Sequence, residues 1–106
     1  MSAHRVPDGS GVYAGTKHAV KALTEALRRE LHAAGSGVRV AALSPGFVQT
    51  EFAEVYAKSK AAAEATYTRY PVLQPDDMAD LVDTVLAAPP HMQIHDVLVR
   101  PNRQTN

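Results

Sequence analysis

Residues 38–46 read Val-Arg-Val-Ala-Ala-Leu-Ser-Pro-Gly, and this stretch decides the fold. It is β-branched at its start and nearly all apolar, which is typical of a strand covered on both faces, as in a parallel sheet. The Pro-Gly pair at 45–46 ends it, because such pairs mark turns and proline cannot continue a ladder. We therefore predict a strand over Val38–Ser44 that ends in a turn.

A long helix is predicted before this strand, over Val12–Ala34. Its apolar residues recur at three- and four-residue spacing and so form one stripe, which consists of Val20, Leu23, Leu27 and Leu31. Gly35 is suited to a left-handed cap at the helix C-terminus. In a complete sheet this stripe would pack across the strands, but this sequence predicts only two strands, so we expect part of the stripe to be uncovered.

The chain after the turn returns to the sheet through helical segments. Residues 49–70 are rich in Ala, Glu and Lys and predict a polar helical excursion, which Pro71 closes. Pro75-Asp76-Asp77 is a helix start, because proline suits the first turn and acids suit the helix dipole. This helix carries its apolar face to about Ala88 and ends at Pro89-Pro90; the face consists of Met78, Leu81, Val82, Val85 and Leu86.

Residues 93–99 read Gln-Ile-His-Asp-Val-Leu-Val and predict a second strand. The order is then helix, strand, helical insert, helix, strand. A strand–helix–strand unit with one crossover implies two parallel strands. The sequence therefore predicts an α/β fold.

Tyr13 and Lys17 stand four residues apart near the start of the first predicted helix, so they share one helix face. An ammonium held close to a phenol favours the phenolate, whereas a free tyrosine titrates near ~10. A tyrosine tuned in this way can pass a proton to or from a carbonyl oxygen. On spacing alone, the alternative is an exposed pair with a minor packing role.

Two motifs together resemble the short-chain dehydrogenase/reductase family. Residues 12–20, Val-Tyr-Ala-Gly-Thr-Lys-His-Ala-Val, resemble its active-site helix, where Tyr-x-x-x-Lys is followed by small and apolar residues. Residues 44–50, Ser-Pro-Gly-Phe-Val-Gln-Thr, match its Pro-Gly-x-x-x-Thr at the end of a strand. Pro90–Ile94 with Pro101 resembles the C-terminus of one subgroup, which contains NADP-dependent 3-hydroxy acid dehydrogenases and the dehydrogenase/reductase family member 11 proteins. Two motifs in the expected order and setting are more specific than either alone.

The resemblance implies the C-terminal part of a Rossmann-type doubly wound parallel sheet. It also implies hydride transfer between a nicotinamide cofactor and a small hydroxyl or carbonyl substrate. Tyr13 is then the general acid/base, and Lys17 favours the ionised tyrosine and binds the nicotinamide ribose. Both residues would contact the cofactor.

The remaining cofactor contacts implied by the resemblance follow the strand. The Pro-Gly turn shapes the nicotinamide pocket, the residue two after the glycine offers backbone groups to the carboxamide, and the threonine hydroxyl holds the cofactor. These roles fall on Pro45, Gly46, Val48 and Thr50. The subgroup resemblance favours NADP, with NAD as the alternative. Taken on its own, the turn would be interpreted as a plain strand terminator.

Two parts of the family pattern are missing from the 106 residues. There is no glycine-rich cofactor turn after a first strand, and Gly9-Ser10-Gly11 does not replace it because no strand precedes it. The family's catalytic serine would fall just before Met1; Ser2 lies about two positions too close to Tyr13 and is interpreted as a loop residue. We expect residues 1–106 to be the C-terminal portion of a single domain whose N-terminal cofactor-binding half lies outside this sequence.

The composition restricts the classes of partner. The formal net charge is 0, with 45% apolar and 21% charged residues, so the chain has no electrostatic footprint for nucleic acid or an anionic membrane. No apolar run approaches the length of a membrane span. Without a visible signal peptide and without cysteine, a cytoplasmic protein is expected.

The other chemistry-bearing residues predict little on their own. The five histidines are scattered, and zinc sites need convergent ligands, so no metal site is predicted. The apolar and aromatic residues of the excursion occupy the family's substrate-loop region and are either a lid or ordinary packing residues: Phe47, Phe52, Val55, Tyr56, Tyr67 and Tyr70.

Two alternatives to an enzyme stay open. A chain without a phosphate-binding turn cannot hold a dinucleotide in the usual way, so it could be a truncated, inactive fold remnant. It could also be an oligomerising module that associates through the outer face of the first helix and an exposed strand edge. In the full-length family context, we expect a homo-oligomer.

Overall fold

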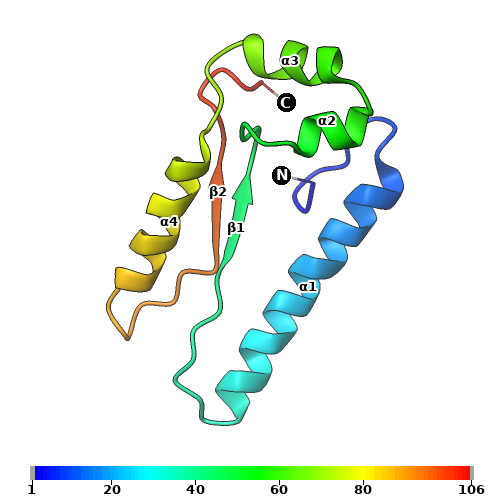
Figure 1. Ribbon diagram of the computed structural model, residues 1–106. Coiled ribbons are helices and arrows are strands. Elements are labelled where there is room, and N and C mark those ends of the chain that lie inside the picture. The colour runs from blue at the N-terminus through cyan, green and yellow to red at the C-terminus, as the bar shows by residue number, and fades with distance from the viewer. Residues whose placement is uncertain (1, 106) are drawn as a thin grey trace. The chain divides into compact units, whose positions relative to one another are not determined.

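The computed structural model describes residues 2–105, except for the side chains of Tyr56, Ala57, Ala63 and Thr66. Tyr56, predicted above as a lid or packing residue, therefore has its side chain outside the described part. The predicted order of elements is confirmed (Figure 1): α1 (Gly11–Ala33), β1 (Ala42–Pro45), α2 (Phe52–Ala57), α3 (Lys60–Thr68), α4 (Pro75–Ala87) and β2 (Asp96–Val99).

The chain divides into two compact units. The first unit comprises Met1–Ser44 and Ala88–Leu98, and therefore holds α1 and most of both strands. The second unit comprises Pro45–Ala87 and Val99–Asn106, and holds α2, α3, α4 and the C-terminal tail.

The two strands pair with each other in a two-stranded sheet. The amide of Ala42 donates to the carbonyl of His95 at 3.0 Å, and four residues later the amide of Gly46 donates to the carbonyl of Val99 at 2.7 Å. The bonded residue numbers rise by four on both strands, which is the register of a parallel pair, and the two arrows in Figure 1 point the same way. The predicted α/β fold with a parallel sheet is confirmed.

Both strands are shorter than predicted, and the reason is a side chain. The Gln93 amide nitrogen Nε2 donates to the carbonyls of Val40 and Ile94, at 2.7 Å in each case. A side chain therefore takes the Val40 carbonyl that a backbone amide would take in a longer ladder. The prediction that β1 is covered on both faces is also wrong, because within β1 only Ser44 is buried.

Helix α1 ends as the sequence predicts. Gly35 has a φ of +71°, in the left-handed region that glycine adopts without steric cost. The amide of Ser36 donates to the carbonyl of Leu31 at 2.9 Å, and the amide of Gly35 donates to the carbonyl of His32 at 3.0 Å. These two bonds form a Schellman motif, which satisfies carbonyls that a helix end otherwise leaves unpaired.

The apolar stripe of α1 is largely uncovered, as predicted for a sheet that lacks part of its strands. Val20, Leu23 and Leu27 are 55%, 68% and 49% exposed, while Thr24 and Arg28 on another face are half-buried. A helix of 23 residues is roughly 35 Å long, whereas two strands of four residues each cover only about 13 Å of its length. In addition, the face of α1 that meets the strands carries Lys21, Thr24 and Arg28, which line a cavity together with Val40 and Asp96, and the stripe lies outside this lining. Ala14 is the one fully buried apolar residue in the described part of the chain.

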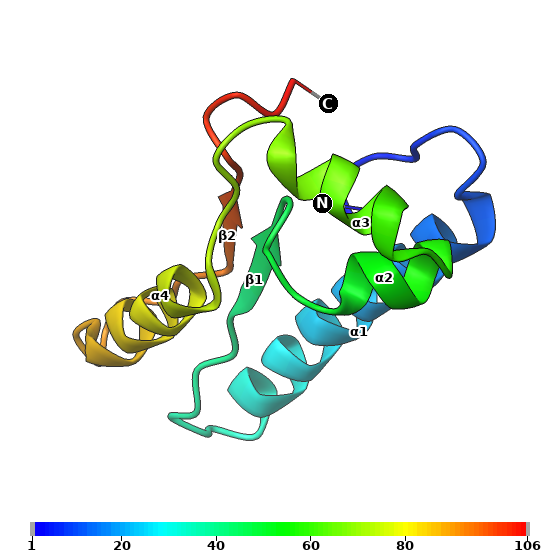
Figure 2. The same cartoon turned by 45° about the horizontal axis from the view of Figure 1, so that its top comes forward.

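The polar excursion consists of two helices rather than one. It breaks at Lys58, which has a φ of +52°, and the Ser59 hydroxyl then caps α3 by accepting a hydrogen bond from the amide of Ala62 at 3.3 Å. Figure 2 shows α2 and α3 packed side by side. The break itself was not predicted, because lysine is an uncommon residue at a positive φ.

Helix α4 begins where predicted. The carboxylate of Asp77 accepts a hydrogen bond from the amide of Gln74 at 2.7 Å, and the amide of Asp77 donates back to the Gln74 carbonyl at 3.1 Å. This exchange satisfies backbone groups at the helix start. The predicted apolar face is only partly covered, since Val82 and Leu86 are exposed while its other members are half-buried. No helix within residues 2–105 is long and apolar enough to cross a membrane.

Candidate active site

Tyr13 and Lys17 lie one turn apart near the start of α1, in the first unit. The Lys17 ammonium nitrogen Nζ lies 5.6 Å from the centroid of the Tyr13 ring. This distance is within the range at which a cation is attracted to an aromatic face. Tyr13 is half-buried and the next residue, Ala14, is fully buried, whereas Lys17 is exposed.

The helix turn that carries the pair is held by its own polar side chains. The Thr16 hydroxyl donates to the Tyr13 carbonyl at 2.7 Å, and His18 Nδ1 lies 2.8 Å from the Ala14 carbonyl. Both bonds follow the i to i−3 and i−4 pattern that serine, threonine and related side chains use in helices. The four-residue spacing thus places the predicted acid/base and its lysine together.

Pro45 and Gly46 lie at the carboxyl end of β1, in the second unit. Pro45 is the last residue of β1, and the Gly46 amide donates to Val99. Ligands of open α/β sheets bind beyond this end of the strands.

Val48 is bridged to Leu73 in a parallel arrangement. The bridge consists of a bond from the Leu73 amide to the Phe47 carbonyl at 3.1 Å and a bond from the Gln49 amide to the Leu73 carbonyl at 2.8 Å. Neither bond uses the N–H or C=O of Val48, which a parallel bridge turns to the opposite side of the chain. Val48 can therefore present both backbone groups to a ligand.

Thr50 is anchored to the excursion through Tyr67 of α3. The Tyr67 hydroxyl donates to the Thr50 carbonyl at 3.0 Å and lies 3.4 Å from the Thr50 amide. The Thr50 hydroxyl oxygen accepts a bond from the amide of Phe52 at 3.2 Å, which leaves its O–H proton for a further acceptor. An exposed threonine held in this way can donate to a cofactor oxygen.

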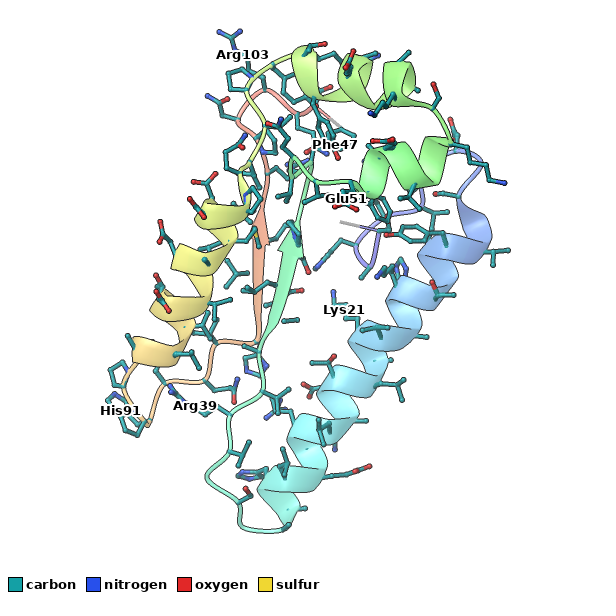
Figure 3. All side chains as sticks on the ribbon, in the orientation of Figure 1. Lys21, Arg39, Phe47, Glu51, His91 and Arg103 are labelled. Atoms are coloured by element: carbon teal, nitrogen blue, oxygen red, sulfur yellow. The ribbon has the colours of Figure 1, made fainter. Side chains whose placement is uncertain are left out.

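The sequence did not predict a polar cluster in the first unit. His4 Nε2 lies 2.8 Å from Asp96 Oδ2 and 3.2 Å from the hydroxyl of buried Ser44, and Lys21 Nζ lies 3.3 Å from His4 Nδ1. An ammonium can only donate, so Nδ1 accepts and Nε2 carries the ring proton. Figure 3 labels Lys21 on the side of α1 that faces the strands. The only sequence signal is Asp96, a lone acid in an otherwise uncharged strand segment.

This cluster does not have the arrangement of a nucleophilic triad. A triad needs the serine and the carboxylate on different ring nitrogens, whereas Ser44 and Asp96 both lie at His4 Nε2. A cavity of about 230 Å³ adjoins the cluster and is lined by charges of both signs, among them Lys21, Glu25 and Asp96. Neither Tyr13 nor Lys17 lines it. No group of three or more His, Asp or Glu side chains that could hold a metal occurs among the described residues.

Charge pairing elsewhere on α1 shifts two pKa values. Arg28 donates from Nε and Nη2 to the two carboxylate oxygens of Glu25, at 2.7 and 2.6 Å. The hydrogen bond to Arg28 lowers the pKa of the Glu25 carboxyl below 4.5, and the same bond raises the pKa of the Arg28 guanidinium. Both groups are solvent-exposed enough that the pair is a surface feature rather than a site.

Comparison with known proteins agrees with the motifs. A family model described as enoyl-(acyl carrier protein) reductase matches residues 1–88. Dehydrogenase/reductase SDR family member 11 from Bos taurus is 46% identical over 107 residues, which cover 98% of this chain and 42% of that protein. Farnesol dehydrogenase from Aedes aegypti is 36% identical over 100 residues, which cover 92% of this chain and 38% of that protein.

A solved structure is similar over the whole chain. It is the closed form of serine dehydrogenase complexed with NADP+, with a TM-score of 0.91 and 32% identity, over 100% of this chain and 43% of that one. The chain thus spans about 40% of the length of these relatives. Because the family model covers most of the chain and both motifs stand on the elements where they were predicted, this protein belongs to the short-chain dehydrogenase/reductase family.

Proposed function

We propose that this chain is the C-terminal, catalytic portion of an NAD(P)-dependent oxidoreductase that acts on a small hydroxyl or carbonyl substrate. The observation that carries the proposal is the Lys17 ammonium 5.6 Å from the Tyr13 ring centroid, in a chain of this family. The names of two relatives, serine dehydrogenase and farnesol dehydrogenase, denote substrates that bear a hydroxyl group.

Tyr13 is the proposed general acid/base. In the reductive direction its O–H gives a proton to the carbonyl oxygen of the substrate, and in the oxidative direction its phenolate takes the proton back. The bound nicotinamide supplies or accepts the hydride. The Lys17 ammonium stabilises the phenolate by its charge and is the proposed donor to the ribose hydroxyls.

The second set of residues is proposed to hold the nicotinamide end of the cofactor. The backbone N–H and C=O of Val48, which the bridge to Leu73 does not use, suit a carboxamide, because a carboxamide needs one donor and one acceptor. The Thr50 O–H suits a phosphate or ribose oxygen. Pro45 and Gly46 shape the turn that leads to them. We propose NADP rather than NAD, because the similar serine dehydrogenase structure is complexed with NADP+.

The phosphates of a dinucleotide need donors that these 106 residues do not supply, because they contain no glycine-rich turn between a strand and a helix. We propose that residues 1–106 are the C-terminal portion of a single domain, whose preceding half supplies that turn. A cytoplasmic location and a homo-oligomeric state complete the proposal. The exposed stripe of Val20, Leu23 and Leu27 supports association with a second copy.

The test is a fusion that restores the part of the relatives that this chain does not span. Residues 2–106 are joined to the N-terminal portion of the Bos taurus relative, and oxidation of NADPH is followed with a panel of ketones and aldehydes. The wild-type fusion should turn over, and Tyr13→Phe should lower kcat roughly 10²–10⁴-fold. Thr84→Val, which removes an exposed hydroxyl on α4, is the control and should keep its rate. A folded fusion in which both variants retain the same rate would contradict the proposal.

A second candidate function is a module without catalysis of its own, in which α1 mediates association. The apolar stripe of α1, exposed along three residues, favours it. It predicts that Tyr13→Phe is silent in every assay while polar substitutions in the stripe abolish assembly.

A further inference from the structure

The C-terminal tail packs against the turn that follows β1, and all residues of this contact lie in the second unit. After β2 the tail makes a turn of its own, in which the Gln104 amide donates to the Pro101 carbonyl at 3.0 Å. Pro101 and Gln104 are both buried, and Gln104 is only 7% exposed. Figure 3 labels Phe47 on the loop after β1 and Arg103 on the tail that turns back toward that loop.

Two consecutive amides of the loop donate hydrogen bonds, one to the end of β2 and one to the tail. The Gly46 amide donates to the Val99 carbonyl at 2.7 Å, and the Phe47 amide donates to the side-chain oxygen Oε1 of Gln104 at 3.1 Å. On the other side of Phe47, its carbonyl accepts from Leu73. The peptide units on both sides of Phe47 are therefore fixed, and the direction of Val48 follows from them.

Gly46 is required by proximity and not by backbone conformation. Its φ is not positive, so an alanine could adopt the same backbone. A Cβ placed at Gly46, however, would collide with Gln104 Oε1 and lie 3.1 Å from Arg100 Cγ. The Gln104 side chain thus occupies the space that any larger residue at position 46 would need.

We infer that Gln104 is a positioning residue for the loop Pro45–Val48. Glycine at position 46 leaves the space that the Gln104 side chain occupies. The inference rests on the proposed function, in which this loop contacts the nicotinamide end of the cofactor. Gln104 does not touch the cofactor; it acts through the Phe47 amide, whose bond aims the backbone groups of Val48. A buried amide oxygen is well suited to this task, because a buried N–H left without an acceptor is costly.

The contact is tested by a double-mutant cycle in the fusion described above, whose unfolding is followed in urea. In Gly46→Ala, the new methyl group expels the Gln104 side chain from the Phe47 amide, so this variant should lose the same bond as Gln104→Ala. Each single change should shift the unfolding equilibrium roughly fivefold, the loss expected for one hydrogen bond. The double variant should equal the worse single variant, whereas independent effects would multiply to roughly 25-fold. A multiplicative result would overturn the inference.

Hydrogen exchange of individual amides shows where Gln104→Ala weakens the structure. It can also be measured if one variant of the cycle is poorly stable. The Phe47 amide should exchange at least several-fold faster in Gln104→Ala than in wild type, while amides in the middle of α1 keep their rates. Gln104→Glu retains an acceptor of nearly the same shape and should restore protection. Asn102→Ala, an exposed change in the same tail, is the control. Equal Phe47 exchange in wild type and Gln104→Ala would overturn the inference.

An NADPH titration distinguishes a failure of this inference from a failure of the proposed function. NADPH is titrated onto the fusion described above, which supplies the phosphate-binding turn, in wild-type form and with each variant, while the Val48 amide resonance is followed. The wild type, Gln104→Glu and Asn102→Ala should respond alike, and Gln104→Ala should bind several-fold more weakly. Equal binding by Gln104→Ala would show a structural role only and overturn the positioning role. Absence of any response in the wild-type fusion would contradict the proposed function, while the cycle and the exchange rates would still decide whether Gln104 holds the loop.

Discussion

The ammonium nitrogen of Lys17 lies 5.6 Å from the centroid of the Tyr13 ring, one turn further along α1. Backbone hydrogen bonds within the helix fix the one-turn offset between the two residues, so both side chains stay on one face whatever the rest of the chain does. Lys17 is exposed, so its ammonium can reach a bound ligand without leaving the helix face that it shares with Tyr13.

Lys17→Ala in the fusion enzyme should therefore impair two quantities at once. The KM for NADPH should rise, because a ribose donor is lost, and kcat should fall, because the phenolate loses its neighbouring charge. Lys17→Arg should recover part of kcat but less of the cofactor affinity, since a planar guanidinium does not replace a point charge. Steady-state kinetics with NADPH as the varied substrate makes the measurement. Lys60→Ala, on an exposed helix of the second unit, is the control. A change in KM without a change in kcat would remove Lys17 from the proton-transfer step.

The 106-residue chain alone should show no turnover. A glycine-rich turn normally brings backbone N–H groups to the dinucleotide phosphates, and this sequence contains none. Purified chain with NADPH and the ketone panel should therefore give the blank rate. Saturable turnover that disappears in Tyr13→Phe would show that residues 1–106 suffice for catalysis.

Arg39 should be a major contributor to the stability of the first unit. Its Nη1 donates to the carbonyls of Ala88, Pro89 and Met92 at 2.9, 3.0 and 3.0 Å, and Figure 3 shows it beside the turn that carries His91. Hydrogen bonds to a charged group are worth about 1.5–3 kcal/mol. Arg39→Ala should lower the free energy of unfolding of the fusion by about that amount in urea titrations, whereas Arg29→Ala, exposed on α1, should change it by less than ~0.5 kcal/mol. Equal effects of the two changes would contradict this role.

The Glu25–Arg28 pair predicts a pH dependence of defined sign. The pKa of Glu25 is lowered in the folded chain, chiefly by its hydrogen bond to Arg28. A carboxyl with a lowered folded pKa stabilises the fold above its unfolded pKa, near 4.5, and loses that contribution as the pH falls through the folded value. In an NMR titration, Arg28→Gln should move the Glu25 midpoint upward, while Arg29→Gln should move it little. An unchanged midpoint in Arg28→Gln would show that the bond is not populated in solution.

Local rules predicted the elements of this chain well, because each rule involves residues that are close in sequence. Gly35 ends α1 through a motif that spans six residues, and Asp77 closes the start of α4 within three. Strand ends were predicted poorly, since they depend on Gln93, which bonds to Val40 from 53 positions away. Periodicity identified the stripe on α1 correctly but could not say what covers it.

The residues of the candidate site also divide into those that a local motif predicts and those that only the fold brings together. Tyr13 and Lys17 follow from a four-residue spacing on a helix, and the Pro45–Thr50 segment follows from a local motif. The cluster of His4 with Ser44 and Asp96 joins residues 40 and 92 positions apart, and its residue types have no shared spacing that a sequence reveals. Gln104 was missed for the same reason, because only the folded tail brings it to Phe47.

The isolated chain should self-associate, and its thermal unfolding should lack strong cooperativity. Val20, Leu23 and Leu27 are 49–68% exposed, and no large side chain in the described part of the chain is fully buried. Each large apolar side chain left in water forfeits about 1.5–3 kcal/mol. Three of them rival the net stability of a small domain, which is about 5–15 kcal/mol. The two-stranded sheet adds exposed edges, and such edges template association.

Size-exclusion chromatography with light scattering should therefore give a mass above 11.4 kDa that rises with concentration. The double change Leu23→Gln and Leu27→Gln keeps good helix formers on α1 and should shift the chain toward monomer. Leu86→Gln, at a leucine of α4 that is 70% exposed, is the matched control and should leave the mass unchanged. If both sets of variants associate as strongly as wild type, the strand edges rather than the stripe cause association. A wild-type chain that is monomeric with one sharp thermal transition would contradict the argument, because that chain would have buried its stripe in some other way.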